Sequence, residues 1–140
     1  GKKLAWANSN WTHLDISTGL PARLTPAYTD NYVLGEKMEM DYAPRKIKLP
    51  ENMIAQEAFT VQKHHLDTNH HVNNCQYVCM AEDFLPESFK IYQMRAEYKM
   101  QAKLGDVICP KVKTETDKVV VSLDNIEGKA YAILEFLKNK

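Results

Sequence analysis

The stretch that decides the fold of this 140-residue chain lies between residues 64 and 85. Its sequence is His64-His65-Leu66-Asp67-Thr68-Asn69-His70-His71-Val72-Asn73-Asn74-Cys75-Gln76-Tyr77-Val78-Cys79-Met80-Ala81-Glu82-Asp83-Phe84-Leu85. The first half contains four of the five histidines of the chain. The second half predicts a helix over residues 71–84, and its apolar residues are spread around most of the circumference, which is typical of a buried helix. Cys75 and Cys79 are therefore expected to be small core residues.

The polar residues that precede this helix allow two interpretations. Asp67, Thr68 and Asn69 are residue types that cap a helix N-terminus, and a cap requires no chemistry. Alternatively, the free N–H groups and the positive dipole end of a helix start suit the oxygen of a polarised carbonyl. A carboxylate, a carboxamide and an imidazole beside that point are the parts of a hydrolytic site. The spacing alone leaves both interpretations open.

A metal site or other cofactor is not expected in this stretch. The histidines form the adjacent pairs 64–65 and 70–71, and neighbouring side chains on a strand or helix point apart. The chain contains neither an HxH nor an HExxH spacing, and it has no CxxC pair. The three cysteines are an odd number and do not suggest a disulfide framework, so a reducing, cytoplasmic compartment is expected.

The segments around the helix predict an antiparallel sheet. One strand is expected before the helix, over residues 58–63, and four strands are expected after it. These four have alternating or β-branched sequences and cover residues 89–101, 107–116, 119–123 and 129–136. The order of one strand, one helix and four strands predicts an α+β fold in which the sheet covers a single buried helix.

The N-terminal third has a different character. Residues 4–16 predict a strand, and Thr25 with Pro26 predicts the start of a helix that ends near Leu34. Residues 36–50 are charged, contain two prolines and are expected to form an extended linker. The basic residues in this linker are either a solvated surface or a docking surface for an acidic partner; they are Arg45, Lys46 and Lys48.

The overall composition excludes several classes of function. Eighteen Lys and Arg residues balance eighteen Asp and Glu residues, so the formal net charge is zero. This balance argues against non-specific nucleic-acid binding and against a basic membrane-surface protein. No apolar run approaches the roughly 20 residues that a membrane span requires.

One motif in the decisive stretch resembles a known family. Residues 66–74, followed by Tyr77, resemble the signature L-D-x-N-x-H-V-N-N-x-x-Y of the acyl-ACP thioesterases of plant plastids and bacteria. Residues 40–47 look like the inter-domain linker of the bacterial members, and residues 97–106 look like the second site strand of the family. The resemblance covers essentially the whole chain.

The resemblance implies a tandem arrangement of two hotdog folds, each an antiparallel sheet wrapped around one long helix. Residues 51–140 then correspond to the C-terminal hotdog domain with the catalytic motif. Residues 1–50 correspond to the closing strands of a first hotdog plus the linker. The first strand and the helix of that first hotdog have no counterpart here, so the chain is expected to be a C-terminal fragment whose N-terminal strands stay exposed or pair with another chain.

The resemblance also implies roles for single residues. Asp67 or His71 is expected to activate water or handle the proton, and Asn69 to orient the reacting group. Backbone N–H groups near Val72 and Asn73 are expected to polarise the thioester carbonyl.

The fourth catalytic position departs from the family pattern. Plant members carry a Glu and then a Cys after a Tyr-Arg-Arg segment, and counting from Tyr98 these positions hold Gln101 and Ala102. A glutamine can hold a water molecule by hydrogen bonds but cannot take its proton. The alanine excludes a cysteine nucleophile at that position.

The expected function is therefore hydrolysis of a fatty acyl-ACP thioester to free fatty acid and acyl carrier protein (ACP). Because ACP is acidic, a basic docking face is expected; candidates are Arg45, Lys46 and Lys48, or Lys103, Lys111 and Lys113. Two alternatives remain open at this point. One is a single-hotdog acyl-CoA thioesterase that works as a homo-oligomer, and the other is a non-catalytic acyl-binding or assembly module.

Overall fold

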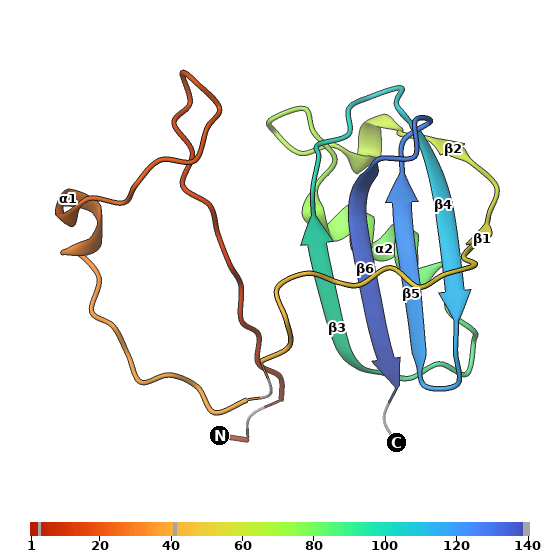
Figure 1. The fold of residues 1–140 in the computed structure, drawn as a ribbon, viewed down its shortest axis with the longest axis horizontal. Coiled ribbons are helices and arrows are strands. Elements are labelled where there is room, and N and C mark those ends of the chain that lie inside the picture. The colour runs from red at the N-terminus through yellow and green to blue at the C-terminus, as the bar shows by residue number, and fades with distance from the viewer. Residues whose placement is uncertain (3, 41, 139–140) are drawn as a thin grey trace. The chain divides into compact units, whose positions relative to one another are not determined.

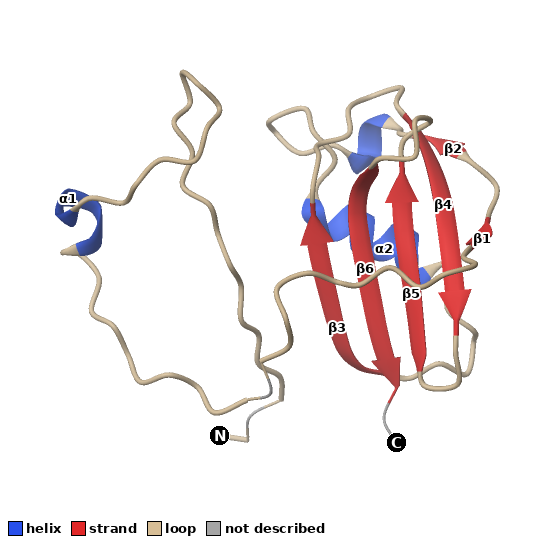
Figure 2. Cartoon of the chain, in the orientation of Figure 1, coloured by secondary structure: helices blue, strands red, loops and turns tan. Residues whose placement is uncertain are grey.

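The computed structural model describes residues 1–2, 4–40 and 42–138. The chain divides into two units, residues 1–41 and 42–140, and each is described by itself. The second unit contains the sheet and the main helix (Figures 1 and 2). The boundary between the two units follows residue 41, whereas the family resemblance implied a boundary after residue 50.

The second unit consists of short elements, one helix and four long strands. In chain order these are β1 (Ile54–Ala55), β2 (Phe59–Thr60), the 3₁₀ turn η1 (Lys63–His65), α2 (Asn74–Glu82), β3 (Ile91–Tyr98), β4 (Val107–Thr114), β5 (Lys118–Asp124) and β6 (Ala130–Lys138). The strand order is β1-β4-β5-β6-β3, all pairs are antiparallel, and β2 also pairs with β4. This order confirms the predicted antiparallel sheet with four strands after the helix.

The core lies between one face of this sheet and α2. Alternate residues of β5 and β6 point into it, among them Val121, Leu134 and Phe136, which are completely buried. The helix contributes Tyr77, Met80 and Ala81 to the same cluster. Burial of these side chains is the main stabilising term, at about 1.5–3 kcal/mol for each large apolar residue.

The helix differs from its prediction in length and burial. It begins at Asn74 rather than residue 71, because the Asn73 side chain accepts the Cys75 N–H at 2.8 Å and caps the helix there. Cys75 and Cys79 are exposed, so the prediction that they are core residues was wrong. They lie on the side of α2 that faces away from the sheet residues it covers, and the apolar pattern in the sequence was too even to reveal this.

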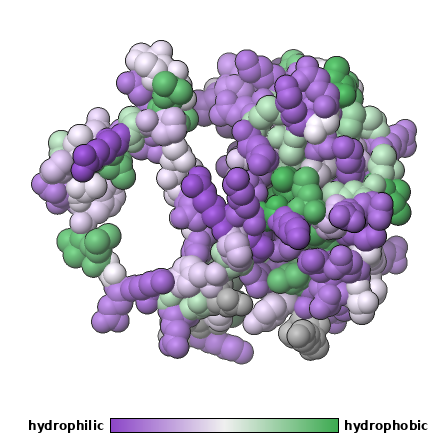
Figure 3. Space-filling model, in the orientation of Figure 1, coloured by the Kyte–Doolittle hydropathy of each residue, from purple (hydrophilic) through white to green (hydrophobic). Residues whose placement is uncertain are grey.

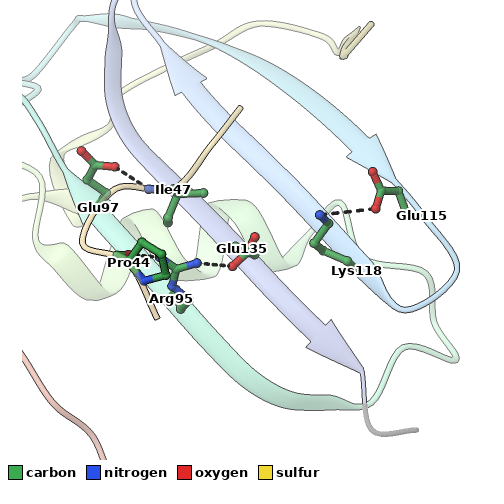
Figure 4. A network of polar contacts seen from close by, with 7 residues as sticks. All are labelled: Pro44, Ile47, Arg95, Glu97, Glu115, Lys118 and Glu135. Carbon is green, nitrogen blue, oxygen red and sulfur yellow. Dashed lines mark hydrogen bonds and ion pairs between the residues drawn. The ribbon is translucent and has the colours of Figure 1, made fainter. Parts of the chain in front are cut away.

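The other face of the sheet is crossed by residues 44–53, which we call the outer-face strap (Figure 1). Ile47 is buried in a small cluster with Val120 of β5 and Ile133 of β6. Its N–H donates to Glu97 Oε2 at 3.1 Å. Figure 4 shows this contact together with Arg95, which donates to the Pro44 carbonyl and pairs with Glu135. The strap therefore explains why β5 is buried on both faces.

Glu97, together with Arg95, is a charged residue that fixes the backbone of the strap. Burial alone would raise the pKa of its carboxyl, but the Ile47 N–H and the Lys99 ammonium outweigh burial and hold that pKa below its ordinary value of 4.5. The Lys99–Glu97 separation is 3.2 Å. Glu97 is therefore ionised at neutral pH and accepts the strap hydrogen bond as a carboxylate.

The first unit forms almost no regular structure. The predicted strand over residues 4–16 is absent from its described part, where Leu14 makes a single bridge to Pro21. The predicted helix is only α1 (Pro26–Thr29), with Thr25 as its N-cap and Pro26 at its first position. None of the described residues before position 41 is buried; Trp6 and Trp11 are 56% and 85% exposed. Apolar side chains accordingly appear on its surface in Figure 3.

Candidate active site

The candidate site is built on a closed loop between η1 and α2. Leu66 and Val72 form an antiparallel bridge, and the Asp67 N–H donates to the His71 carbonyl at 2.9 Å. The His70 N–H donates to the Asp67 carbonyl at 3.1 Å, which tightens the turn. His70 has a φ of 62°, a left-handed conformation that closes the loop at the cost of local strain. We call residues 67–71 the site loop.

The Asp67 carboxylate organises the site loop from inside. Its Oδ1 accepts the Asn69 N–H at 2.8 Å and the His71 N–H at 3.3 Å. The structure thus brings together Asp67, Asn69 and His71, three of the predicted site residues, in a single turn. Asp67 and His71 are half-buried and Asn69 is exposed. No described residue donates to Asp67 Oδ2, so one carboxylate oxygen has no protein partner in the described part of the chain.

The two predicted carbonyl-binding donors do not have free N–H groups. The Val72 N–H donates to the Ala102 carbonyl at 2.9 Å, and the Asn73 N–H donates to the His65 carbonyl at 3.0 Å. Their predicted role therefore does not fit the structure, because the helix starts later than expected. Within the described residues, the Asn74 N–H at the true helix start has no acceptor. The capping interpretation of residues 67–69 is also wrong, since Asn73 is the cap.

Gln101 is held close to the site loop through the backbone of its neighbour. The buried Ala102 accepts from Val72 and donates its own N–H to the Tyr77 hydroxyl at 2.9 Å. Ala102 thus joins the end of the site loop to the first turn of α2. The Gln101 side chain is exposed and makes no hydrogen bond to Asp67, Asn69 or His71 in this part of the structure. The structure therefore places Gln101 beside the loop but does not bring its amide to the carboxylate.

Three tyrosines make hydrogen bonds around the site, and only Tyr77 was included in the sequence motif. The Tyr98 hydroxyl donates to the Asn74 carbonyl at 3.2 Å, and the Tyr131 hydroxyl donates to Asp106 Oδ2 at 3.3 Å. Burial raises the pKa of all three phenols, so they are neutral hydrogen-bonding groups at physiological pH. The sequence carried no signal for the roles of Tyr98 and Tyr131, because their partners are backbone or distant side chains.

His65, another histidine of this stretch, has a structural role. His65 Nδ1 accepts the Gln62 N–H at 2.9 Å and closes η1. Burial, followed by the nearby His64, lowers the pKa of His65, which keeps Nδ1 available as an acceptor at neutral pH. Residues 1–2, 4–40 and 42–138 contain no group of three or more His, Cys, Asp or Glu that could hold a metal ion.

The geometry supplies the components of a hydrolytic site. A half-buried carboxylate, an amide and an imidazole occupy one turn, and a free backbone donor lies at the start of the adjacent helix. Such a set can hold a water molecule, direct it at a carbonyl and stabilise the charge that develops on the carbonyl oxygen.

The chain matches a known protein family. A model of the acyl-ACP thioesterase C-terminal domain matches residues 48–134, which is more than half of the chain. The matched range contains the site loop, Gln101, strands β1 to β5 and residues 130–134 of β6. Among curated protein sequences, none matches the chain significantly.

Several solved structures share the fold. An acyl-ACP thioesterase from Bacteroides thetaiotaomicron is 18% identical, with a TM-score of 0.78 over 90% of this chain and 53% of that protein. A Lactobacillus plantarum structure assigned as an oleoyl thioesterase is 18% identical, with a TM-score of 0.62 over 90% of this chain and 52% of that protein. A Staphylococcus aureus protein in complex with CoA is 17% identical, with a TM-score of 0.55 over 64% of this chain and 76% of that protein.

These likenesses establish the fold, and they confirm the predicted hotdog class. The chain spans about half the length of the Bacteroides and Lactobacillus proteins. No helix in the described residues is long and apolar enough to cross a membrane.

Proposed function

The chain belongs to the acyl-ACP thioesterase family through its C-terminal domain, and from this premise we propose that it carries the catalytic site of a fatty acyl-ACP hydrolase. The observation that carries the proposal is the Asp67 carboxylate, which lies in one closed turn with Asn69 and His71 and keeps one oxygen without a described partner. Asp67 Oδ1 holds the turn by accepting two backbone N–H groups, so the proposed chemistry is assigned to the other oxygen, Oδ2.

The proposed reaction is attack of water on the thioester carbonyl, cleavage of the carbon–sulfur bond, and release of a fatty acid and the carrier thiol. Asp67 or His71 takes the proton of the attacking water and returns a proton to the leaving thiolate. Asn69 orients the reacting group. The Asn74 N–H, in place of the occupied Val72 and Asn73 groups, donates to the carbonyl oxygen as negative charge develops there.

Gln101 is proposed to hold the attacking water by hydrogen bonds and not to act as a base, because an amide cannot accept the proton. The proton must then go to Asp67 or His71. This assignment predicts that Gln101→Ala impairs turnover less than loss of either of those groups.

The proposed partner is ACP. Arg45, Lys46 and Lys48 are exposed on the outer-face strap on either side of the buried Ile47, so their backbone positions are fixed by the sheet. In the second candidate set, Lys111 is paired with Asp124 at 2.9 Å, which reduces the charge it offers to a partner. The strap residues are therefore our preferred docking surface.

We propose that the complete protein contains another hotdog and that residues 1–50 belong to its closing strands and the linker. The exposed apolar residues of the first unit support this arrangement, since they require a partner surface. A reducing, cytoplasmic setting is part of the proposal and is consistent with three free cysteines.

The first experiment compares palmitoyl-ACP with palmitoyl-CoA as substrates of the complete protein and of the 140-residue chain. The proposal predicts a higher kcat/KM for the ACP thioester, and a loss of that preference when Arg45, Lys46 and Lys48 are replaced by Gln. Equal use of both thioesters would instead favour the acyl-CoA alternative, which the CoA complex of the S. aureus structure suggests. Binding of either thioester without hydrolysis by the complete protein would favour the non-catalytic alternative.

The second experiment separates the two adjacent histidines of the site loop. His71→Asn is expected to lower kcat by about 10²-fold or more, as is typical for loss of an acid–base group. His70→Asn is the matched control, because asparagine tolerates the left-handed φ of 62° at that position. Turnover that falls equally in both variants would indicate a structural effect of the loop and would contradict the assigned role of His71.

A further inference from the structure

Two thiols lie one turn apart on the outer side of α2. Cys75 and Cys79 are both exposed, whereas the residues of the same helix that face the sheet are buried; these are Tyr77, Met80 and Ala81. Residues four apart in a helix lie on one face, with their Cβ atoms roughly 5–6 Å apart. The two side chains therefore leave the helix from the same patch of its surface, and we call them the thiol pair.

The backbone that carries the thiol pair is held by hydrogen bonds at both positions. The Cys75 N–H donates to Asn73 Oδ1 at 2.8 Å, and the Cys79 carbonyl accepts the Asp83 N–H at 3.3 Å. Both residues belong to a helix whose opposite face packs into the main core. The helix therefore fixes the separation of the two side chains at their Cβ atoms.

The two sulfurs also interact with each other. Local desolvation, followed by the charge and the hydrogen bond of Cys75, raises the pKa of the Cys79 thiol. Burial, followed by the charge of Cys75, raises the pKa of the Tyr98 phenol beside it. A negative charge on one of these groups thus disfavours a negative charge on the next, and a cation bound between the two sulfurs relieves that repulsion.

The spacing of the thiol pair favours a shared ion over a disulfide. A disulfide requires Cβ atoms about 3.5–4.5 Å apart, which is less than the roughly 5–6 Å that one helical turn provides. Two sulfurs that bind one metal ion at about 2.3 Å each can themselves lie up to about 4.6 Å apart. The hydrogen bond between the thiols shows that the two sulfurs already approach each other from their helical positions.

The number of available ligands selects the kind of ion. In the part of the chain that the structure describes, no third His, Cys, Asp or Glu completes a metal-binding group with the thiol pair. Zn²⁺ in a structural site takes four protein ligands, so two thiolates alone hold it weakly. Soft thiolate ligands select Cu(I), which accepts a coordination number of two.

We propose that Cys75 and Cys79 bind one soft monovalent cation of the Cu(I) class. The ion replaces the two thiol protons, which are released to water, and neither sulfur is oxidised. This site goes beyond the proposed activity and does not depend on it. It adjoins the candidate active site, because Cys75 directly follows Asn74, whose N–H is the proposed carbonyl donor.

Anaerobic competition for Cu(I) with the chelator bathocuproine disulfonate tests the proposal on the 140-residue chain. The chain is expected to take one equivalent of Cu(I) from the chelator. Cys75→Ser and Cys79→Ser are each expected to weaken binding at least about tenfold, because each removes one of two ligands. Cys109→Ser is the matched control and is expected to leave binding unchanged, since Cys109 lies in β4 and not on α2. A wild-type chain that takes no Cu(I) from the chelator would overturn the proposal.

A rearranged pair tests the spacing. Gln76→Cys combined with Cys79→Ser keeps two thiols on α2 but places them at adjacent positions, which do not face each other on a helix. This variant is expected to bind Cu(I) at least about tenfold more weakly than the wild-type chain. Equal affinity of the rearranged pair, or of the two single serine variants, would identify an adventitious ion only and overturn the proposal.

Alkylation of the unchanged chain tests the site without any substitution. Bound Cu(I) is expected to protect Cys75 and Cys79 from iodoacetamide, because the exposed thiols become metal ligands. Mass spectrometry of peptides from the chain measures the modification of each cysteine with and without the ion. Alkylation of both residues at the same rate in the two conditions would contradict the proposed site.

Discussion

The two units of this chain contain similar kinds of residues and use them differently. Residues 1–41 include two tryptophans, several leucines and a predicted strand and helix, yet none of their described residues is buried. Residues 42–138 bury their apolar residues on both faces of one sheet, against α2 on one side and the outer-face strap on the other. The comparison shows that a sequence pattern typical of a strand forms a strand in this chain where a second layer of structure covers its apolar side chains.

The first prediction has the largest expected effect and compares a leucine-to-alanine substitution in each of the two units. Leu134→Ala removes a completely buried side chain from β6 and is expected to lower the free energy of unfolding by about 3–4 kcal/mol. Leu4→Ala changes a leucine that is 90% exposed and is expected to cost less than about 0.5 kcal/mol. Urea denaturation followed by circular dichroism measures both. Equal losses would mean that the first unit has a core of its own.

The second prediction concerns the strap. Ile47→Ala is expected to cost about 2 kcal/mol, because Ile47 fills a small cluster with Val120 and Ile133 and not the main core. Ile54→Ala in β1 is the matched control, since Ile54 is largely exposed. The same denaturation experiment applies. If Ile47→Ala were as mild as Ile54→Ala, the strap would be a passive linker, as the sequence suggested.

The third prediction concerns the hydrogen bond between Ala102 and Tyr77, which connects the end of the site loop to α2. Tyr77→Phe leaves the buried Ala102 N–H without its acceptor and is expected to cost about 1–3 kcal/mol. Tyr32→Phe, at an exposed tyrosine of the first unit, is expected to be neutral. The unfolding midpoint of each variant in urea is the readout. A neutral Tyr77→Phe would show that a water molecule or another group replaces the hydroxyl.

The smallest expected effect is the pH dependence of the strap contact. Because the pKa of Glu97 is lower in the folded protein than its ordinary 4.5, its contribution to stability is complete above that pH. It is lost as the pH falls through the folded-state value. Glu97→Gln should therefore cost up to about 1 kcal/mol at pH 7 and nothing near pH 2. Glu127→Gln, on the β5–β6 hairpin, should show a smaller difference, because the ion pair of Glu127 with Lys129 is largely exposed. Thermal unfolding of each variant at both pH values is the measurement. A loss of stability that is the same at pH 7 and pH 2 would contradict the ionic role of Glu97.

The sequence predicted the fold well where its signal was local and periodic. The four strands after the helix were found because alternation in residues such as 94–101 reflects one buried and one open face. The helix start was missed by three residues, since Asp67, Thr68, Asn69 and Asn73 are all good capping types and the sequence cannot rank them.

The strap and the strandless first unit could not be predicted for a different reason. The burial of Ile47 depends on contacts with Val120 and Ile133, more than seventy residues away in sequence. Of the candidate site, the sequence motif identified Asp67, Asn69 and His71, and the structure places them in one turn. Their chemical roles stay a prediction. The carbonyl donor was misassigned, because the hydrogen bonds that occupy Val72 and Asn73 are made to Ala102 and His65.

The most direct test of the account is the rate of fatty acyl-ACP hydrolysis by the complete protein carrying Asp67→Asn. Asparagine keeps an Oδ1 acceptor for the Asn69 and His71 N–H groups, so the site loop and the unfolding midpoint should be preserved while the carboxylate charge is lost. Asp117→Asn, in the β4–β5 turn, is the matched control. We predict a fall in kcat of about 10²–10⁴-fold for Asp67→Asn and none for the control. A folded Asp67→Asn variant that hydrolyses the thioester at the wild-type rate would contradict the central claim.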